Sequence, residues 1–203
     1  MARCVVFCAG GFQGLEKPLL PDDYIIAADG GFSHVQSLGC KPDCILGDFD
    51  SLGFVPEGAQ VFPVEKDDTD AMLAVRHGLS LGYKEFVFYG ALEGARLDHT
   101  ISNYQTLLYL VSQGAHGTLV GQHQSVTTVT DRLVFPQGMD GTVSVFAVGG
   151  DAQGVTLRGL KYNVENVTLT PAFPLGVSNH FTGNAASIAV KSGTLLVVYP
   201  TMR

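Results

Sequence analysis

The sequence predicts an α/β fold: an N-terminal Rossmann-like, mostly parallel sheet with helices on both faces, followed by a small C-terminal antiparallel β-sandwich or barrel. Between residues 4 and 121 short apolar runs alternate with longer amphipathic stretches, as in βαβ units. After about residue 125 the segments become short, β-rich and separated by Gly, Pro and Asn. Because 203 residues with 46% hydrophobic content can form two small cores, we expect an α/β domain at 1–124 and a β-rich domain at 125–203.

The apolar runs and amphipathic stretches place the individual elements. In the first domain strands are expected at 4–9, 24–28, 44–46, 60–64, 85–89 and 117–120. Helices are expected between them at 32–38, 69–81 and 96–112. On the last helix a core-facing stripe is predicted from the spacing of Leu97, Ile101, Tyr104, Leu108 and Val111. Strands of the second domain are expected at 143–147, 154–158, 166–170, 187–190 and 194–199.

Charge and hydropathy argue against two classes of partner. The formal net charge is −7 with only 12 Lys and Arg, so the clustered bases that neutralise nucleic-acid phosphates are missing. The apolar run at 4–9 is too short to span a membrane and ends in glycines rather than at a cleavage site. We expect a cytoplasmic protein that binds neither nucleic acid nor membrane.

The four cysteines form two C-x3-C pairs, Cys4/Cys8 and Cys40/Cys44. Such pairs could suggest a metal site. In a strand, however, four residues span roughly 13 Å, so Cys4 and Cys8 could not share one zinc ion. We expect buried free thiols.

The segment Gly47-Asp48-Phe49-Asp50-Ser51 directly follows an apolar run and therefore lies at the carboxyl end of a predicted strand, where ligands bind in open α/β sheets. If the extended conformation continues, Asp48 and Asp50 point the same way, about 6 to 7 Å apart, with Phe49 turned into the core. Two such carboxylates can hold a hard cation. The alternative is a turn in which Asp and Ser cap the next segment.

More carboxylates follow other predicted strands. Lys66-Asp67-Asp68-Thr69-Asp70 opens a predicted helix, and Asp29 precedes Gly30-Gly31. Acids at a helix start also serve as caps and favour the macrodipole, which is the alternative interpretation. Gathering several acids at one sheet edge costs repulsion, so a cation is implied. Mg²⁺ bound to substrate phosphates suits carboxylate oxygens best, since no His or Cys cluster competes.

A glycine-bearing loop, Gly90 to Ala95, leads into the long predicted helix. There Arg96, His99 and Asn103 share a face apart from the apolar stripe. The alternative is an ordinary solvated face. The functional interpretation is that loop amides and Arg96 contact a phosphate. No Walker A sequence is present after the first strand, so phosphate binding depends on this loop, carboxylates and metal.

In this order and spacing the chain resembles the thiamine pyrophosphokinase family over nearly its whole length. The family pattern of Asp-Gly-Gly, Gly-Asp-Phe-Asp-Ser, Asp-x-x-Asp and Arg-Leu-Asp-His is matched at 29–31, 47–51, 67–70 and 96–99. Residues 159–162 and 176–179 resemble the family's thiamine-binding strand and loop. Two departures stand out: the loop Gly90 to Arg96 is one residue longer than the family's Gly-Ala-x-Gly-Gly-Arg, and Tyr162 stands where some members have Trp.

The resemblance implies a Mg-dependent thiamine diphosphokinase that uses ATP and acts as a homodimer, with each site shared between subunits. Mg²⁺ would be held by Asp48, Asp50 and Asp70. Nucleotide contacts would come from Gly90, Gly94, Arg96, His99, Asn103, Asp67 and Thr69. Thiamine would be bound by Asp29, Tyr162, Ser178 and Asn179. The residues implied in catalysis are Asp29, Asp48, Asp50, Asp70, Arg96 and Asp98.

The expected reaction is in-line attack of the thiamine hydroxyl on the β-phosphorus of ATP, with AMP leaving. A general base, if needed, could be Asp98 or Asp29. One rival is a haloacid-dehalogenase-type phosphatase, suggested by Asp48-Phe49-Asp50, although Ser51-Leu52 and the β-rich tail do not fit that fold. The other rival is a binding module whose acids are only caps.

Overall fold

The computed structural model describes residues 2–16, 18–50, 52–65 and 67–202. The chain divides into two compact units, residues 1–122 and 123–202. Two residues of the predicted acidic segments, Ser51 and Lys66, lie outside the described residues. Each unit is described by itself below.

The first unit is built on a parallel sheet with the strand order β4-β3-β2-β1-β5-β6. Its strands are β1 (Cys4–Phe7), β2 (Tyr24–Ala28), β3 (Cys44–Gly47), β4 (Gln60–Val61), β5 (Glu85–Tyr89) and β6 (His116–Val120). The central strands are rich in Val, Ile and Phe and are almost completely buried, as expected of a sheet covered on both faces. Since all the strands run the same way, the loops that follow them share one edge of the sheet.

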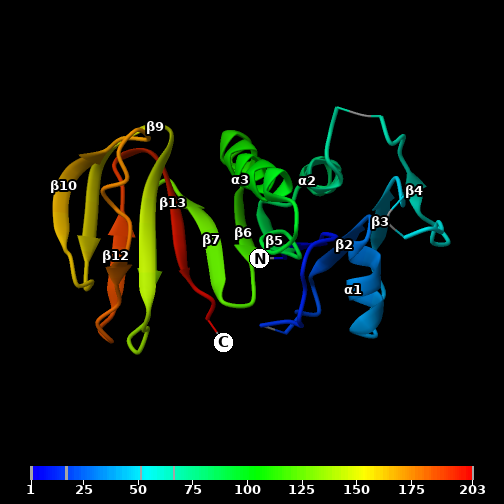
Figure 1. Cartoon of the computed structure of the whole chain (residues 1–203), viewed down its shortest axis with the longest axis horizontal. Coiled ribbons are helices and arrows are strands. Elements are labelled where there is room, and N and C mark those ends of the chain that lie inside the picture. The colour runs from blue at the N-terminus through cyan, green and yellow to red at the C-terminus, as the bar shows by residue number, and fades with distance from the viewer. Residues whose placement is uncertain (1, 17, 51, 66, 203) are drawn as a thin grey trace. The chain divides into compact units, whose positions relative to one another are not determined.

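Three helices cover this sheet: α1 (Gly31–Ser37), α2 (Asp70–Ser80) and α3 (Leu97–Ser112). Val35 of α1 packs with Val5 and Phe7. Gly78 of α2 lies against Phe86 and Cys4, where a Cβ would overlap with the ring. Because neighbouring side chains of a strand point to opposite faces, α1 and α2 cover different faces. Figure 1 shows α2 beside α3, with α1 on the other side of the strands.

The buried face of α3 differs from the predicted stripe. Leu97 and Ile101 are 71% and 50% exposed, whereas Leu107 and Leu110 are fully buried. The buried side also contains two polar residues, Asn103 and Thr106, whose hydrogen bonds are made within the fold. Those polar positions interrupt the apolar pattern of the real core face, so the prediction of a stripe through Leu97 and Ile101 is wrong.

The second unit contains only strands, and the pairs between them are antiparallel. They are β7 (Gln124–Val129), β8 (Arg132–Phe135), β9 (Thr142–Arg158), β10 (Val164–Leu169), β11 (Asn179–His180), β12 (Ala186–Ala189) and β13 (Ser192–Pro200). The first half of β9 pairs with β13, and its second half pairs with β10 and β12. Gly149 and Gly150, both with positive φ, stand between the halves. A core around Phe135, Ile188 and Leu195 fills this unit.

The mixed α/β class is confirmed. The segments 143–147 and 154–158 are one strand rather than two, and the strand expected at 60–64 is limited to Gln60–Val61. Strands β7, β8 and β11 were not expected. The Rossmann-like description of the first unit, and the sandwich or barrel description of the second, stay predictions. Among the described helices none is long and apolar enough to cross a membrane.

The four cysteines are free thiols. Cys4, Cys8 and Cys44 are buried as predicted, but Cys40 is only half-buried. Burial raises the pKa of the Cys4 and Cys8 thiols to about 12, because a thiolate is poorly solvated there. These two side chains therefore behave as small apolar groups.

Candidate active site

A cleft of about 770 Å³ lies along the carboxyl ends of the parallel strands in the first unit. The loops after β1, β2, β3 and β5 line it, together with the first turns of α2 and α3. Most of the predicted site residues of this unit are among its walls: Asp29, Asp48, Asp50, Thr69, Asp70, Gly90, Gly94, Arg96, His99 and Asn103. The prediction that the acidic segments gather at one edge of the sheet is therefore confirmed.

Three carboxylates of this cleft form a compact group. Asp29, Asp48 and Asp50 each offer an oxygen, and these oxygens lie within 4.8 Å of one another. Asp29 is buried, Asp48 is half-buried and Asp50 is exposed, so the group opens from the sheet edge to solvent. Asp29 was predicted near thiamine rather than with the metal ligands. Its position here makes it a further candidate ligand, in addition to the three that were predicted.

The backbone brings these carboxylates together by close approach of two loops. The N–H of Asp29 donates to the carbonyl O of Leu46 at 2.8 Å, and Asp29 has a φ of +47°. Gly47 has a φ of +150°, and a Cβ there would lie only 3.0 Å from the Cα of Asp29. Glycine at position 47 therefore permits the ends of β2 and β3 to touch.

The chain does not stay extended after Gly47, which corrects the sequence-based picture. Strand β3 ends at Gly47, and Phe49 has a φ of +60°. The side chain of Phe49 is nevertheless buried, as predicted, with 3% of its surface exposed. The N–H of Asp50 donates to Oδ1 of Asp48 at 3.3 Å. A turn centred on the buried Phe49, rather than strand alternation, brings the two carboxylates together.

The Asp29-Gly30-Gly31 motif also has a steric cause. A Cβ at Gly31 would overlap with the carbonyl O of Phe7, so α1 can begin this close to β1 only with glycine. The backbone N–H of Phe32 donates to the carbonyl O of Asp29 at 3.1 Å. The motif thus fixes Asp29 between a strand end and a helix start.

The acidic segment before α2 combines capping with cleft lining. Thr69 caps the helix, since its Oγ1 accepts from the N–H of Met72 at 3.2 Å. Asp68 forms an ion pair with Arg76 at 3.1 Å. Asp70, in the first turn, lines the cleft, whereas Asp67 is exposed and is not among the residues that line it. The capping interpretation is confirmed for Thr69, and a role of Asp70 in binding a cation stays a prediction.

The loop from Gly90 to Arg96 is held against the loop after β1. The N–H of Gly10 donates to the carbonyl O of Gly90 at 2.9 Å, and Gly90 has a φ of +66°. Nδ2 of Asn103 donates to the carbonyl O of Ala91 at 2.7 Å. Asn103 therefore reaches the cleft from α3 and also supports the loop. His99 lines the cleft as well.

Arg96 and Asp98 form a two-point ion pair at the mouth of the cleft. Nη2 of Arg96 lies 2.6 Å from Oδ2 of Asp98, and Nε lies 3.2 Å from Oδ1. The hydrogen bonds with Arg96 lower the pKa of Asp98, and they raise the pKa of Arg96. Asp98 itself does not line the cleft. Its direct contact is with Arg96 rather than with the carboxylate group.

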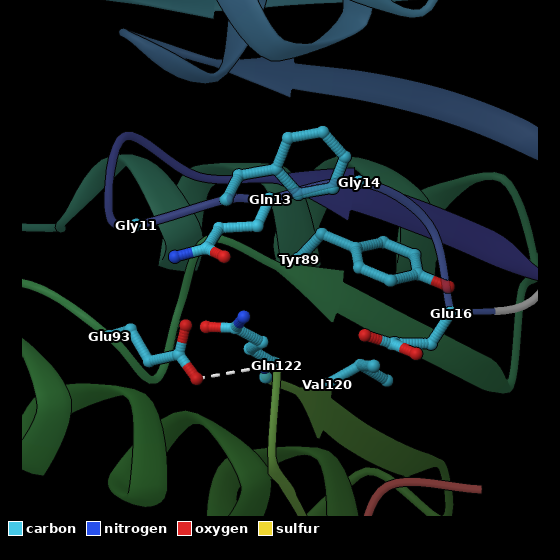
Figure 2. Close-up of a pocket in the computed structure, with 10 residues that line it drawn as sticks. Gly11, Gln13, Gly14, Glu16, Tyr89, Glu93, Val120 and Gln122 are labelled. Carbon is cyan, nitrogen blue, oxygen red and sulfur yellow. Dashed lines mark hydrogen bonds between the residues drawn. The ribbon is translucent and has the colours of Figure 1, made fainter. Parts of the chain in front are cut away.

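Cleft residues that the sequence analysis did not select include Cys8, Gly10, Gly11, Glu93, Thr100 and Ser102. The signal for two of them was present, because Gly10-Gly11 directly follows the first strand. A small cavity of about 10 Å³ adjoins this region, and Figure 2 shows Glu93 and Gln122 on one side of it and Glu16 on another.

The predicted thiamine residues lie in the second unit. Tyr162 is 58% exposed, and Nζ of Lys161 lies 5.3 Å from the centre of its ring. Asn179, on β11, is hydrogen-bonded to the backbone of Tyr162 in both directions. Ser178 has a φ of +61°, and its N–H donates to Oγ of Ser144 at 3.1 Å. The structure thus brings Tyr162, Ser178 and Asn179 into one region.

Comparison with known families assigns each of the two units to a domain. Residues 16–119 match the family model described as thiamin pyrophosphokinase, catalytic domain. Residues 131–195 match the model described as thiamin pyrophosphokinase, vitamin B1 binding domain. The chain belongs to the thiamin pyrophosphokinase family. Membership makes it an enzyme, a diphosphotransferase with thiamine and ATP as substrates.

Relatives of the family agree along almost the whole chain. The thiamine pyrophosphokinase of Bacillus subtilis (strain 168) is 24% identical over 192 residues, which cover 87% of this chain and 86% of the relative. The crystal structure of the Bacillus subtilis thiamine pyrophosphokinase has a TM-score of 0.83 at 23% identity and covers 99% of both chains. Yeast thiamin pyrophosphokinase has a TM-score of 0.69 at 14% identity, covering 99% of this chain and 86% of its own. The fold is therefore the one these proteins share.

Proposed function

We propose that this chain transfers the diphosphate group of ATP to the hydroxyl of thiamine, giving thiamine diphosphate and AMP, in a Mg-dependent in-line displacement at the β-phosphorus. The observation that carries this proposal is the group of three carboxylate oxygens within 4.8 Å, set in a cleft of about 770 Å³ beside the Arg96 loop. A cleft of this volume is large enough for a nucleotide and a second small molecule.

The donor set fits magnesium. Mg²⁺ binds oxygen ligands at about 2.1 Å, so two ligands of one ion lie at most about 4 Å apart. The oxygens of Asp29, Asp48 and Asp50 need only a small closure, or a bridging water, to meet this limit. We infer that Asp48, Asp50 and Asp70 are ligands or hold its waters, with Asp29 as a further candidate. When bound, the ion neutralises phosphate oxygens and the charge that develops on them.

The Gly90–Arg96 loop and the first turn of α3 would bind the nucleotide. Gly90 and Gly94 let the backbone approach a phosphate closely, and Arg96 presents a planar fork of donors. His99, Asn103 and Thr69 line the same cleft and would complete the contacts. Among the predicted nucleotide contacts Asp67 has the weakest support, because it does not line the cleft.

Arg96 would stabilise the charge on the bridging or leaving oxygen. Its two-point pair with Asp98 fixes the guanidinium plane. Between the two candidates for a general base, the position of Asp29 inside the cleft favours it over Asp98, which is occupied by Arg96.

Thiamine would be held by the second unit, in the part matched by the vitamin B1 binding domain. Tyr162 offers an exposed ring face to the cationic thiazolium. Nζ of Lys161 lies 5.3 Å from the centre of this ring, which supports a ring face that attracts a positive charge. Ser178 and Asn179 adjoin it and would orient the second ring.

We further propose a homodimer in which the first unit of one subunit and the second unit of its partner form each site. The support is an exposed apolar segment of the second unit, directly before Ser178 and Asn179 in the sequence, where the exposed fractions are 65% for Phe173, 60% for Leu175 and 43% for Val177. Apolar groups that gather in this way mark interaction surfaces.

One experiment tests the reaction against its rivals. The protein is incubated with ATP, Mg²⁺ and thiamine, and the nucleotide product is identified. AMP that appears only when thiamine and Mg²⁺ are both present supports the proposal. Release of phosphate from a phosphomonoester without thiamine would favour a phosphatase, and Mg-independent binding without ATP consumption would favour a binding module.

A further inference from the structure

Glu93 joins the ends of three neighbouring strands. It follows β5, and its carbonyl O accepts a hydrogen bond from the N–H of Gly11, which follows β1. Its carboxylate Oε1 accepts from the N–H of Gln122, which follows β6, at 2.8 Å. Figure 2 shows this carboxylate directed at Gln122 across the edge of the small cavity. A substitution of the side chain removes the bond to Gln122, whereas the backbone carbonyl still accepts from Gly11, so the carboxylate is the group that ties this loop to the end of β6.

Successive carbonyl groups of the Gly90–Arg96 loop accept hydrogen bonds, and Glu93 is the last residue of this series. The carbonyl of Gly90 accepts from Gly10, that of Ala91 from Asn103, and that of Leu92 from Oγ1 of Thr100. Glu93 is the next residue and adds both its carbonyl and its carboxylate. It is therefore the last of this run of anchors before Gly94-Ala95-Arg96.

The negative charge of the Glu93 carboxylate is unexpected at this position. Glu93 lines the cleft in which we place the ATP phosphates, and a negative side chain would repel them. Its hydrogen bond to Gln122 directs one carboxylate oxygen toward the end of β6 instead. The cavity beside it has room for about one water molecule, so the carboxylate has little freedom to turn in that direction.

We propose that Glu93 is a positioning residue that clamps the Gly90–Arg96 loop to the ends of β1 and β6, and so sets where Arg96 and the loop amides meet the phosphates of ATP. This loop is one residue longer than the family pattern, and each added residue increases the conformational entropy that ordering must overcome. The hydrogen bonds of Glu93 offset the entropy cost of ordering this longer loop. The proposal depends on the proposed function in one respect, that this loop binds ATP.

The test compares Glu93→Ala with Glu93→Gln, which keeps an oxygen acceptor, and with Glu57→Ala as an exposed control in the same unit. Amide hydrogen exchange is measured at Gln122 and Gly11 in each protein. We expect protection at Gln122 to fall about tenfold or more in Glu93→Ala, because a hydrogen bond to a charged group is lost. Glu93→Gln should keep much of the protection, and Glu57→Ala all of it.

Steady-state kinetics provide the second readout. In Glu93→Ala the KM for ATP should rise about tenfold while the KM for thiamine at saturating ATP stays near the wild-type value. Glu93→Gln should recover most of the loss. Unchanged exchange at Gln122 together with an unchanged KM for ATP would overturn the clamp, as would equal losses for ATP and thiamine without recovery by Gln. If the wild-type protein forms no AMP, the proposed function fails, whereas the exchange measurement still decides the clamp.

Discussion

Asn179 and Tyr162 exchange two hydrogen bonds between a side chain and a backbone. Nδ2 of Asn179 donates to the carbonyl O of Tyr162 at 2.7 Å, and the N–H of Tyr162 donates to Oδ1 of Asn179 at 3.0 Å. Asn179 is 5% exposed, whereas the Tyr162 side chain is largely open to solvent. A buried amide thus fixes the backbone of an exposed aromatic residue, so the ring has a defined place without being packed.

The first prediction concerns this pair. Asn179→Ala removes both hydrogen bonds and leaves the N–H of Tyr162 without this acceptor, so the Tyr162 loop should loosen. The KM for thiamine should rise about tenfold while the KM for ATP stays unchanged. Asn184→Ala, at an exposed asparagine of the same unit, is the matched control. A parallel rise in both KM values would mean that Asn179 does not act through the thiamine site.

The second prediction concerns the three carboxylates. Because like charges within a few ångströms repel, Asp48→Asn should raise the melting temperature without divalent cations by about 2–4 °C. The same change should abolish the stabilisation by Mg²⁺ and lower turnover by roughly a hundredfold or more. Thermal unfolding with and without Mg²⁺ measures the first two effects, with Asp22→Asn as an exposed control.

Asp70 stands apart from this group within the same cleft, and Asp70→Asn decides its role. We expect intact folding and loss of turnover, together with a weaker stabilisation by Mg²⁺. Near-normal turnover in this variant would remove Asp70 from the metal site.

The third prediction concerns acid stability. Burial alone would raise the pKa of Asp23, but hydrogen bonds from Arg3 at 2.6 and 2.8 Å and from the N–H of Leu20 outweigh it and lower the pKa. The resulting stability is fully present above the ordinary Asp pKa of about 3.9 and is lost as the pH falls through the lower folded value.

Asp23→Asn should therefore be less stable than wild type at pH 7, by about 1–3 kcal/mol. Its free energy of unfolding should also change less than that of wild type between about pH 5 and pH 2. Denaturant unfolding across this range measures both. An identical pH dependence in the two proteins would show that the ion pair between Arg3 and Asp23 does not cause the loss of stability at low pH.

Much of the first unit could be predicted because its signals are local. Strands such as Glu85–Tyr89 and helices such as Asp70–Ser80 follow from apolar runs, periodicity and a Thr69 cap. The buried face of α3 could not be predicted in this way. Asn103 and Thr106 point inward because the fold supplies partners for them, and no apolar pattern records such partners.

The second unit was less predictable for a related reason. Strands β7, β8 and β11 pair with segments far along the chain, so their stability comes from the partner rather than from their own pattern. Asn179 was expected at the site from the family resemblance. Its role in holding Tyr162 became visible only when β11 and the Tyr162 turn lay side by side.

The sequence by itself determined the α/β class, the edge of the sheet that carries the chemistry, and the residue types gathered there. A parallel βαβ rhythm forces every strand to end at one edge, and acids that follow those strands must meet there. Tertiary structure alone decided how close they come. Asp29 joins Asp48 and Asp50 because two loops touch at Gly47 and the chain turns at the buried Phe49. Such contacts depend on backbone sterics between segments distant in sequence, which no local pattern contains.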